Sequence, residues 1–173
     1  MTRQVLNLFA LFVAFCIPAA SAGDAATDLQ NEFAGSWKLI SIEGPATRNG
    51  QASTGKPSGI IMFDHTGHMA VQLVRGDRPA FAEGANGTAQ ERAQAYVSYT
   101  AYYGTYTFEP ENRVVIYHLE SSLNPGQIGQ SYIRYFEFKG NRLTLSVADA
   151  GRGGRLAFKD TTQHFIWEKI PNN

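Results

Sequence analysis

The amino-acid sequence predicts an all-β fold, a sandwich or barrel of eight antiparallel strands with one inserted helix. Eight short segments are rich in β-branched and aromatic residues, and three pairs of them are separated only by a tight turn. One capping-box pattern marks a helix among them. A chain of 173 residues can bury one core without disulfides, so we expect a single barrel-forming domain, over residues 33–171.

The first 22 residues have the pattern of a cleaved secretory signal peptide. Arg3 is followed by an apolar run, Val5 to Ile17, and by the small residues Ala20-Ser21-Ala22. We predict cleavage after Ala22 and a secreted or periplasmic protein, with an uncleaved N-terminal anchor as the alternative. The run is too short to span a bilayer comfortably. Cleavage would remove Cys16, the chain's one cysteine, and with it any disulfide or thiolate chemistry.

Three strands are expected before the helix, at residues 35–43, 58–64 and 68–75, after a polar lead-in over residues 23–32. A loop rich in Gly, Pro, Ser and Asn separates the first two strands. The turn His65-Thr66-Gly67 joins the next two into a hairpin. His65, His68 and Asp64 are residue types that bind metal ions, and they lie close together in the sequence. Because a zinc site needs three or four converging ligands, we expect a surface turn instead.

A helix is expected over residues 89–103. Thr88 and Glu91 form a capping box at its start, and Gly104 suits its C-terminal end. At about 100° per residue, four tyrosines share one face of this helix, and a fifth follows it: Tyr96, Tyr99, Tyr102 and Tyr103, then Tyr106. Each ring has an apolar face and a polar tip. The stripe therefore either packs on the end of the barrel as a plug or forms one wall of a ligand site.

Five further strands are expected, at residues 104–109, 112–120, 130–138, 141–147 and 164–170. Pro110-Glu111 and Lys139-Gly140 give two more hairpin turns. The last strand can return beside the first, and such closure would remove the exposed edges of the sheet.

Several short motifs occur in a recognisable order along the chain. Gly35-Ser36-Trp37 opens the first strand, and the runs RGDRPAF (75–81), AYYGTY (101–106), HLESSLNP (118–125) and RLTLS (142–146) precede Trp167. This order resembles the lipocalin-like domain family of small bacterial and fungal proteins, from about Phe33 to Ile170. The resemblance implies an eight-stranded calycin-type barrel and no particular activity. The chain departs from it at Pro125-Gly126-Gln127, where relatives often carry Pro-Asn-Trp.

His118 and Glu120 are candidates for acid–base chemistry. They lie two residues apart, so a strand would place them on one face with Val114 and Ile116, which we expect to be interior. Arg134 in the next strand could pair with Glu120. The group is either a buried structural network or a general acid or base oriented by a carboxylate. In the second case Tyr103 or Tyr106 would donate a hydrogen bond to an oxyanion.

A third group, Arg75, Asp77 and Arg78, precedes a proline. It forms either a locked turn or a site in which one arginine reaches the barrel mouth and binds a carboxylate or phenolate.

From these features we expect a barrel that binds a small, largely apolar ligand of aromatic, isoprenoid or polyketide-like character. The expected ligand-binding residues are Tyr96, Tyr99, Tyr102, Tyr103, Tyr106, Met69, Arg75, Arg78 and Arg134. One alternative is an isomerase, cyclase or hydratase that needs no cofactor or metal and uses His118, Glu120 and Tyr103. A barrel with a fully packed interior is the other alternative.

The balance of charge bears on the partners of the protein. The chain has 15 basic and 15 acidic residues, which argues against a nucleic acid or an anionic membrane as partner. No second apolar segment is long enough to be transmembrane.

Overall fold

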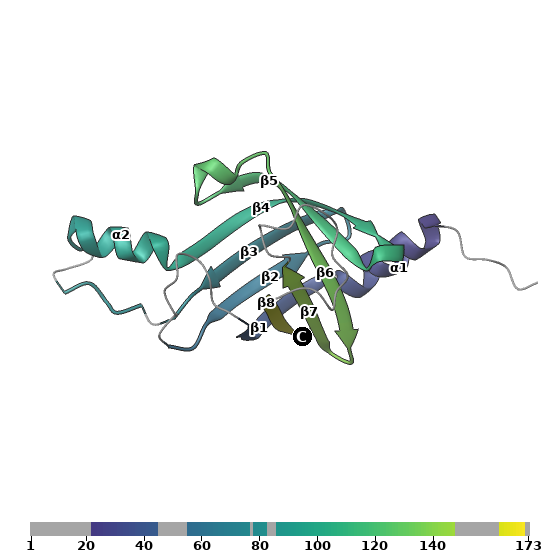
Figure 1. Ribbon diagram of the computed structural model, residues 1–173, viewed down its shortest axis with the longest axis horizontal. Helices are drawn as coiled ribbons and strands as arrows, with labels where there is room; N and C mark the ends of the chain where they lie inside the picture. Colours follow the sequence, from purple (N-terminus) through teal and green to yellow (C-terminus); the bar gives the residue numbers. More distant parts are fainter. Residues whose placement is uncertain (1–21, 45–54, 77, 83–85, 148–162, 172–173) are drawn as a thin grey trace, which may run out of the picture.

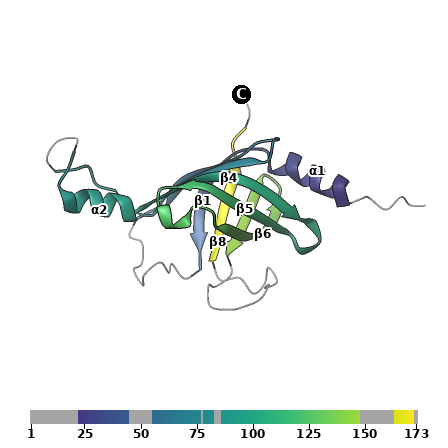
Figure 2. The same cartoon turned by 90° about the horizontal axis from the view of Figure 1, so that it is seen from above.

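The computed structural model describes residues 22–44, 55–76, 78–82, 86–147 and 163–171. Within these ranges the chain forms two α-helices, two short 3-10 helices and eight strands (Figures 1 and 2). The predicted signal peptide, apart from Ala22, and Asp77 of the predicted arginine turn lie outside the described residues. None of the described helices is long and apolar enough to cross a membrane.

The eight described strands close into an antiparallel barrel. Each strand pairs with its neighbours in sequence, and the last pairs with the first. The strands are β1 (Gly35–Glu43), β2 (Ser58–Phe63), β3 (His68–Val74), β4 (Tyr99–Glu109), β5 (Val114–Ser122), β6 (Ser131–Lys139), β7 (Arg142–Val147) and β8 (Gln163–Lys169). The prediction of an all-β barrel with an inserted helix is confirmed. Strand bounds agree with the prediction to within two residues except at the start of β4, which begins five residues earlier than predicted. A 3-10 turn (Pro110–Asn112) joins β4 to β5.

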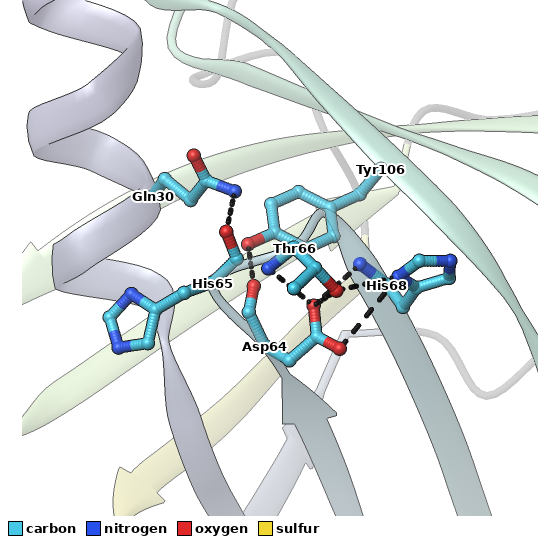
Figure 3. Close-up of polar contacts among 6 residues, drawn as sticks. All are labelled: Gln30, Asp64, His65, Thr66, His68 and Tyr106. Atoms are coloured by element: carbon cyan, nitrogen blue, oxygen red, sulfur yellow. Dashed lines mark hydrogen bonds and ion pairs between the residues drawn. The ribbon is translucent and has the colours of Figure 1, made fainter.

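The β2–β3 hairpin turns on the carboxylate of Asp64 (Figure 3). One oxygen of this carboxylate accepts hydrogen bonds of 2.8 Å from the backbone N–H of Thr66, the Thr66 hydroxyl and the backbone N–H of His68. These bonds, the one from the His68 backbone foremost, lower the pKa of Asp64. The carboxylate therefore organises the turn. Within the described ranges, no cluster of three or more His, Cys, Asp or Glu side chains could hold a metal ion.

Helix α1 (Ala22–Phe33) covers one end of the barrel, where the sequence predicted only a polar lead-in (Figures 1 and 2). The side chain of Gln30 joins the helix to the hairpin turn, because it donates a hydrogen bond of 2.7 Å to the His65 carbonyl (Figure 3). The Phe33 ring is fully buried. Its centre lies 4.9 to 5.2 Å from the centres of four other rings, those of Phe63, Phe108, Phe136 and Phe138. This aromatic plug closes that end of the barrel.

Helix α2 (Ala89–Val97) projects from the opposite end of the molecule (Figure 1). The predicted capping box is confirmed, since the Thr88 hydroxyl accepts from the Glu91 N–H at 3.2 Å and the Glu91 carboxylate accepts from the Thr88 N–H at 2.6 Å. The prediction that the helix continues to Tyr103 is wrong. From Tyr99 the chain alternates as strand β4 and pairs with both β3 and β5. Aromatic and β-branched residues favour such a strand, and the pairing on two sides outweighs the helical periodicity.

Candidate functional site

The barrel contains a cavity of about 380 Å³. Helix α1 contributes no residue to its wall, whereas Leu73 and Val147 near the far ends of β3 and β7 do. The cavity therefore lies toward the end of the barrel away from the Phe33 plug. The lining residues are mainly aliphatic and aromatic: Ile61, Val71, Leu73, Arg75, Thr100, Tyr102, Tyr117, Gln127, Tyr132, Arg134, Leu145, Val147, Gln163, Phe165 and Trp167.

Arg134 on β6 lies in this cavity among aromatic rings. It stands opposite Val115, a buried core residue, so its side chain points inward. Its guanidinium carbon is 5.0 Å from the centre of the Tyr132 ring and 5.8 Å from that of Tyr117. The guanidinium also lies near the hydroxyl of Tyr102 and favours its ionised form. We call these four residues, Arg134 with Tyr102, Tyr117 and Tyr132, the Arg134 cluster.

The three tyrosines of the Arg134 cluster pack against one another. The centre of the Tyr102 ring lies 5.8 Å from that of Tyr132, nearly perpendicular to it, and 6.5 Å from that of Tyr117. Tyr117 and Tyr132 are direct partners in the β5–β6 ladder. One wall of the cavity is thus a continuous aromatic surface with a single positive charge upon it.

Burial raises the pKa of Tyr102 and raises that of Tyr117 well above its usual value. The positive charge of Arg134 opposes this effect at both hydroxyls. Both phenols therefore remain protonated in neutral solution and can donate hydrogen bonds. Arg134 stabilises whatever negative charge develops beside it.

Two donors of the cavity wall are buried without a hydrogen-bond partner among the described residues. They are the hydroxyl of Tyr117 and the indole N–H of Trp167, and the two side chains are only 1% and 3% exposed. Leaving a buried donor unpaired costs free energy. Such a group in a native fold calls for an explanation, and an ordered water or the polar group of a bound molecule would supply one.

The five predicted tyrosines do not form one surface. Tyr102 lines the cavity, whereas Tyr103, the next residue, is 54% exposed on the outside. Tyr96 is exposed on α2. The Tyr99 hydroxyl donates a hydrogen bond of 2.8 Å to the Gln72 side chain outside the cavity. Tyr106 is a buried core residue whose hydroxyl donates a hydrogen bond of 2.7 Å to the backbone carbonyl of Asp64 (Figure 3).

The other predicted ligand-binding residues divide in the same way. Arg75 lines the cavity, and its guanidinium carbon lies 5.9 Å from the centre of the Phe165 ring. Arg78 lies outside the barrel. Its guanidinium carbon is 5.0 Å from the centre of the Tyr99 ring, and its guanidinium donates a hydrogen bond of 3.3 Å to the Ala95 carbonyl. Met69 is a buried core residue that does not line the cavity.

The expectation that His118 and Glu120 face the interior is wrong. The core-facing residues of β5 are the odd-numbered ones, Val115, Tyr117 and Leu119. Val114 is buried as well, although Ile116 is only half-buried. Apolar residues on both faces of the strand therefore concealed its orientation.

The surroundings of His118 are those of an outer-face residue. Its ring nitrogens lie 3.1 Å from the Thr107 hydroxyl and 3.0 Å from the Ser131 hydroxyl. Glu120 is exposed, and Arg134 stands opposite Val115 inside the barrel, so the predicted pairing of Glu120 with Arg134 is not formed. Tyr103, the expected catalytic hydroxyl, also points away from the cavity.

Most cavity residues were not predicted as ligand contacts from the sequence, and three of these carry hydrogen-bonding groups on aromatic rings: Tyr117, Tyr132 and Trp167. The signal for one of them was present. In QSYIRYFEF, Tyr132, Arg134 and Phe136 recur at every second position, which places them on one face of a strand. Tyr117 shares its face with Val115 and Leu119 in the same manner.

Comparison with known proteins agrees with this architecture. A family model described as a lipocalin-like domain matches residues 34–170. The curated proteins include none that matches the chain. A lipocalin-like barrel suggests ligand binding in general and specifies neither ligand nor reaction. Because the match extends over most of the sequence and over all eight described strands, the chain belongs to the family of lipocalin-like domains.

Proposed function

We propose that this protein binds a small, largely apolar molecule inside its barrel. The observation that carries the proposal is the cavity of about 380 Å³ with its mainly aliphatic and aromatic wall. Small-molecule pockets are typically about 300–1,000 Å³, with a few polar groups that orient the ligand. Eight-stranded barrels are just wide enough to hold one small ligand.

The chemical character of the wall supports an aromatic, isoprenoid or polyketide-like guest. Phe165 and Trp167 of β8 line the cavity together with the three tyrosines of the Arg134 cluster. Flat unsaturated skeletons bury well against such rings. The signal-like pattern of residues 1–22 supports a secreted or periplasmic site of action, which is part of the proposal.

The alternative of an isomerase, cyclase or hydratase acting through His118 and Glu120 finds no support in the geometry. Both side chains lie on the outer face of β5, away from the cavity. A substrate inside the barrel would be separated from them by the strand itself.

Fluorescence titration with N-phenyl-1-naphthylamine, an uncharged probe that brightens in apolar surroundings, tests the proposal. We expect saturable binding to the wild type and loss of binding in Thr100→Trp, which places a large ring on the cavity wall. The matched control is Glu137→Trp, on an exposed position of β6. Native mass spectrometry of protein purified from its own host would identify any retained molecule. No saturable binding by the wild type, together with a ligand-free mass, would contradict the proposal.

A further inference from the structure

The described wall of the cavity carries positively charged side chains and no negatively charged ones. Arg134 and Arg75 line it, whereas no aspartate or glutamate is among its lining residues. Arg134 makes no ion pair with any described carboxylate, and its guanidinium donates a hydrogen bond of 2.9 Å to the Ile133 carbonyl. Arg134 is partly exposed, so the cavity wall removes only part of its hydration. The rings of Tyr117 and Tyr132 compensate the guanidinium only in part.

The hydrogen-bonding groups around this positive charge are mostly donors. An arginine and an indole N–H can only donate. Trp167 and Tyr117 each hold a buried donor with no partner among the described residues. Burial raises the pKa of the Tyr102 hydroxyl, so this group is neutral and has a proton to donate. A complementary guest therefore carries acceptors, and the charge of Arg134 favours an acceptor that is negative.

We infer that the ligand is an organic acid whose carboxylate pairs with Arg134 while its apolar body lies along Tyr102, Tyr117 and Tyr132. This inference rests on the proposed binding in the barrel and names the class of molecule that is bound. A planar guanidinium matches a carboxylate with two parallel hydrogen bonds, and such charge-assisted bonds are about twice as strong as neutral ones. The aromatic wall would accept an aromatic or polyene skeleton in preference to a sugar or a peptide.

Matched acids and alcohols test the inference. We would measure the binding of 2-naphthoate and dodecanoate, and of 2-naphthalenemethanol and 1-dodecanol, by displacement of N-phenyl-1-naphthylamine at neutral pH. The wild type should bind each acid at least about tenfold more tightly than its alcohol, as expected for hydrogen bonds to a charged group. Arg134→Gln should abolish that preference, because it should weaken the binding of the acids by a larger factor than that of the alcohols.

Two further variants distinguish recognition from damage to the fold. Arg134→Lys keeps the charge without the planar fork and should retain part of the preference for acids. Arg142→Gln removes an arginine from the outer end of β7, where it lies 3.9 Å from Glu168, and should leave the preference unchanged. Thermal unfolding of each variant checks that the barrel is intact.

The outcomes separate the two proposals. If acids and alcohols bind equally well to the wild type, or if Arg134→Gln weakens both equally, the assignment of an acidic ligand is wrong while binding in the barrel stands. If neither the uncharged probe nor any acid or alcohol binds to the wild type, the proposed function fails and the inference fails with it.

Discussion

The indole N–H of Trp37 donates a hydrogen bond of 2.7 Å to the backbone carbonyl of Phe33, and both residues are almost fully buried. Trp37 lies on β1, and Phe33 is the last residue of α1. The final carbonyls of a helix have no partner within it. The barrel wall itself therefore satisfies this one, and the bond holds the Phe33 ring in the end of the barrel.

Phe33→Ala should be strongly destabilising. The variant loses contacts with four rings at a fully buried position and leaves a void in the plug. We expect the free energy of unfolding to fall by about 3–5 kcal/mol, measured by urea denaturation. Glu32→Ala, at the neighbouring exposed position, should change it by less than about 0.5 kcal/mol. Equal effects of the two variants would show that the plug contributes little.

Tyr102→Ala and Tyr103→Ala should differ although the residues are adjacent. Tyr102 lines the cavity and packs on two rings, whereas Tyr103 is 54% exposed. We expect Tyr102→Ala to lose about 3 kcal/mol of stability and to alter the binding of N-phenyl-1-naphthylamine. Tyr103→Ala should change stability by less than about 0.5 kcal/mol and leave binding as it is. A larger binding defect in Tyr103→Ala would place the site elsewhere.

Tyr106 should make stability depend on alkaline pH. Burial raises the pKa of its hydroxyl to about 12, so the fold favours the neutral phenol. This contribution is fully present below the unfolded pKa of about 10 and is lost as the pH rises through about 12. Wild type should therefore lose its advantage over Tyr106→Phe, on the order of 1 kcal/mol for one hydrogen bond, across that interval.

Denaturation curves recorded from neutral to alkaline pH measure this difference. Tyr102 and Tyr117 are present in both proteins, so their own raised pKa values cancel in the comparison. A constant difference between wild type and Tyr106→Phe across the alkaline interval would contradict the assignment.

Gly104→Ala should prevent normal closure of the β4–β5 ladder. A Cβ atom at this position would overlap the carbonyl oxygen of His118, where the ladder shifts register between Tyr103 and Gly104. Backbone on both sides prevents relief of the overlap, and we expect a loss of several kcal/mol, above the usual range of about 0.5–3 kcal/mol for single substitutions. Gly126→Ala meets only the Asn124 side chain at 3.4 Å and serves as the control. Similar melting temperatures for the two variants would refute the steric argument.

The sequence was sufficient to predict the barrel because its hairpins are local. The turn at residues 65–67 lies between segments whose alternation was legible. The site was harder to predict for a physical reason. In β5, both Val114 and Val115 are fully buried, so hydrophobicity gave no reliable indication of which face is interior. Orientation there follows from the pairing of Tyr117 with Tyr132, a contact between strands that no single segment encodes.

The tyrosine-rich segment illustrates a second limit. Its spacing fits a helix, yet Tyr99 to Glu109 form a strand because β3 and β5 are available on either side. A local periodicity cannot register a partner that lies elsewhere in the chain. Three of the residues predicted to bind a ligand, Arg75, Tyr102 and Arg134, do line the cavity, and their contact with a ligand stays a prediction.

The pairing of β8 with β1 has a consequence for the nascent chain. The other seven ladders join strands that follow one another, but this one joins residues 35–43 to residues 163–169. The barrel cannot close until the ribosome has released the final strand, and joining distant segments is the slow step in folding β-rich chains. Until then the outer edge of β1 is open to pairing with other chains. Such a polypeptide gains from a chaperone that shields this edge during synthesis.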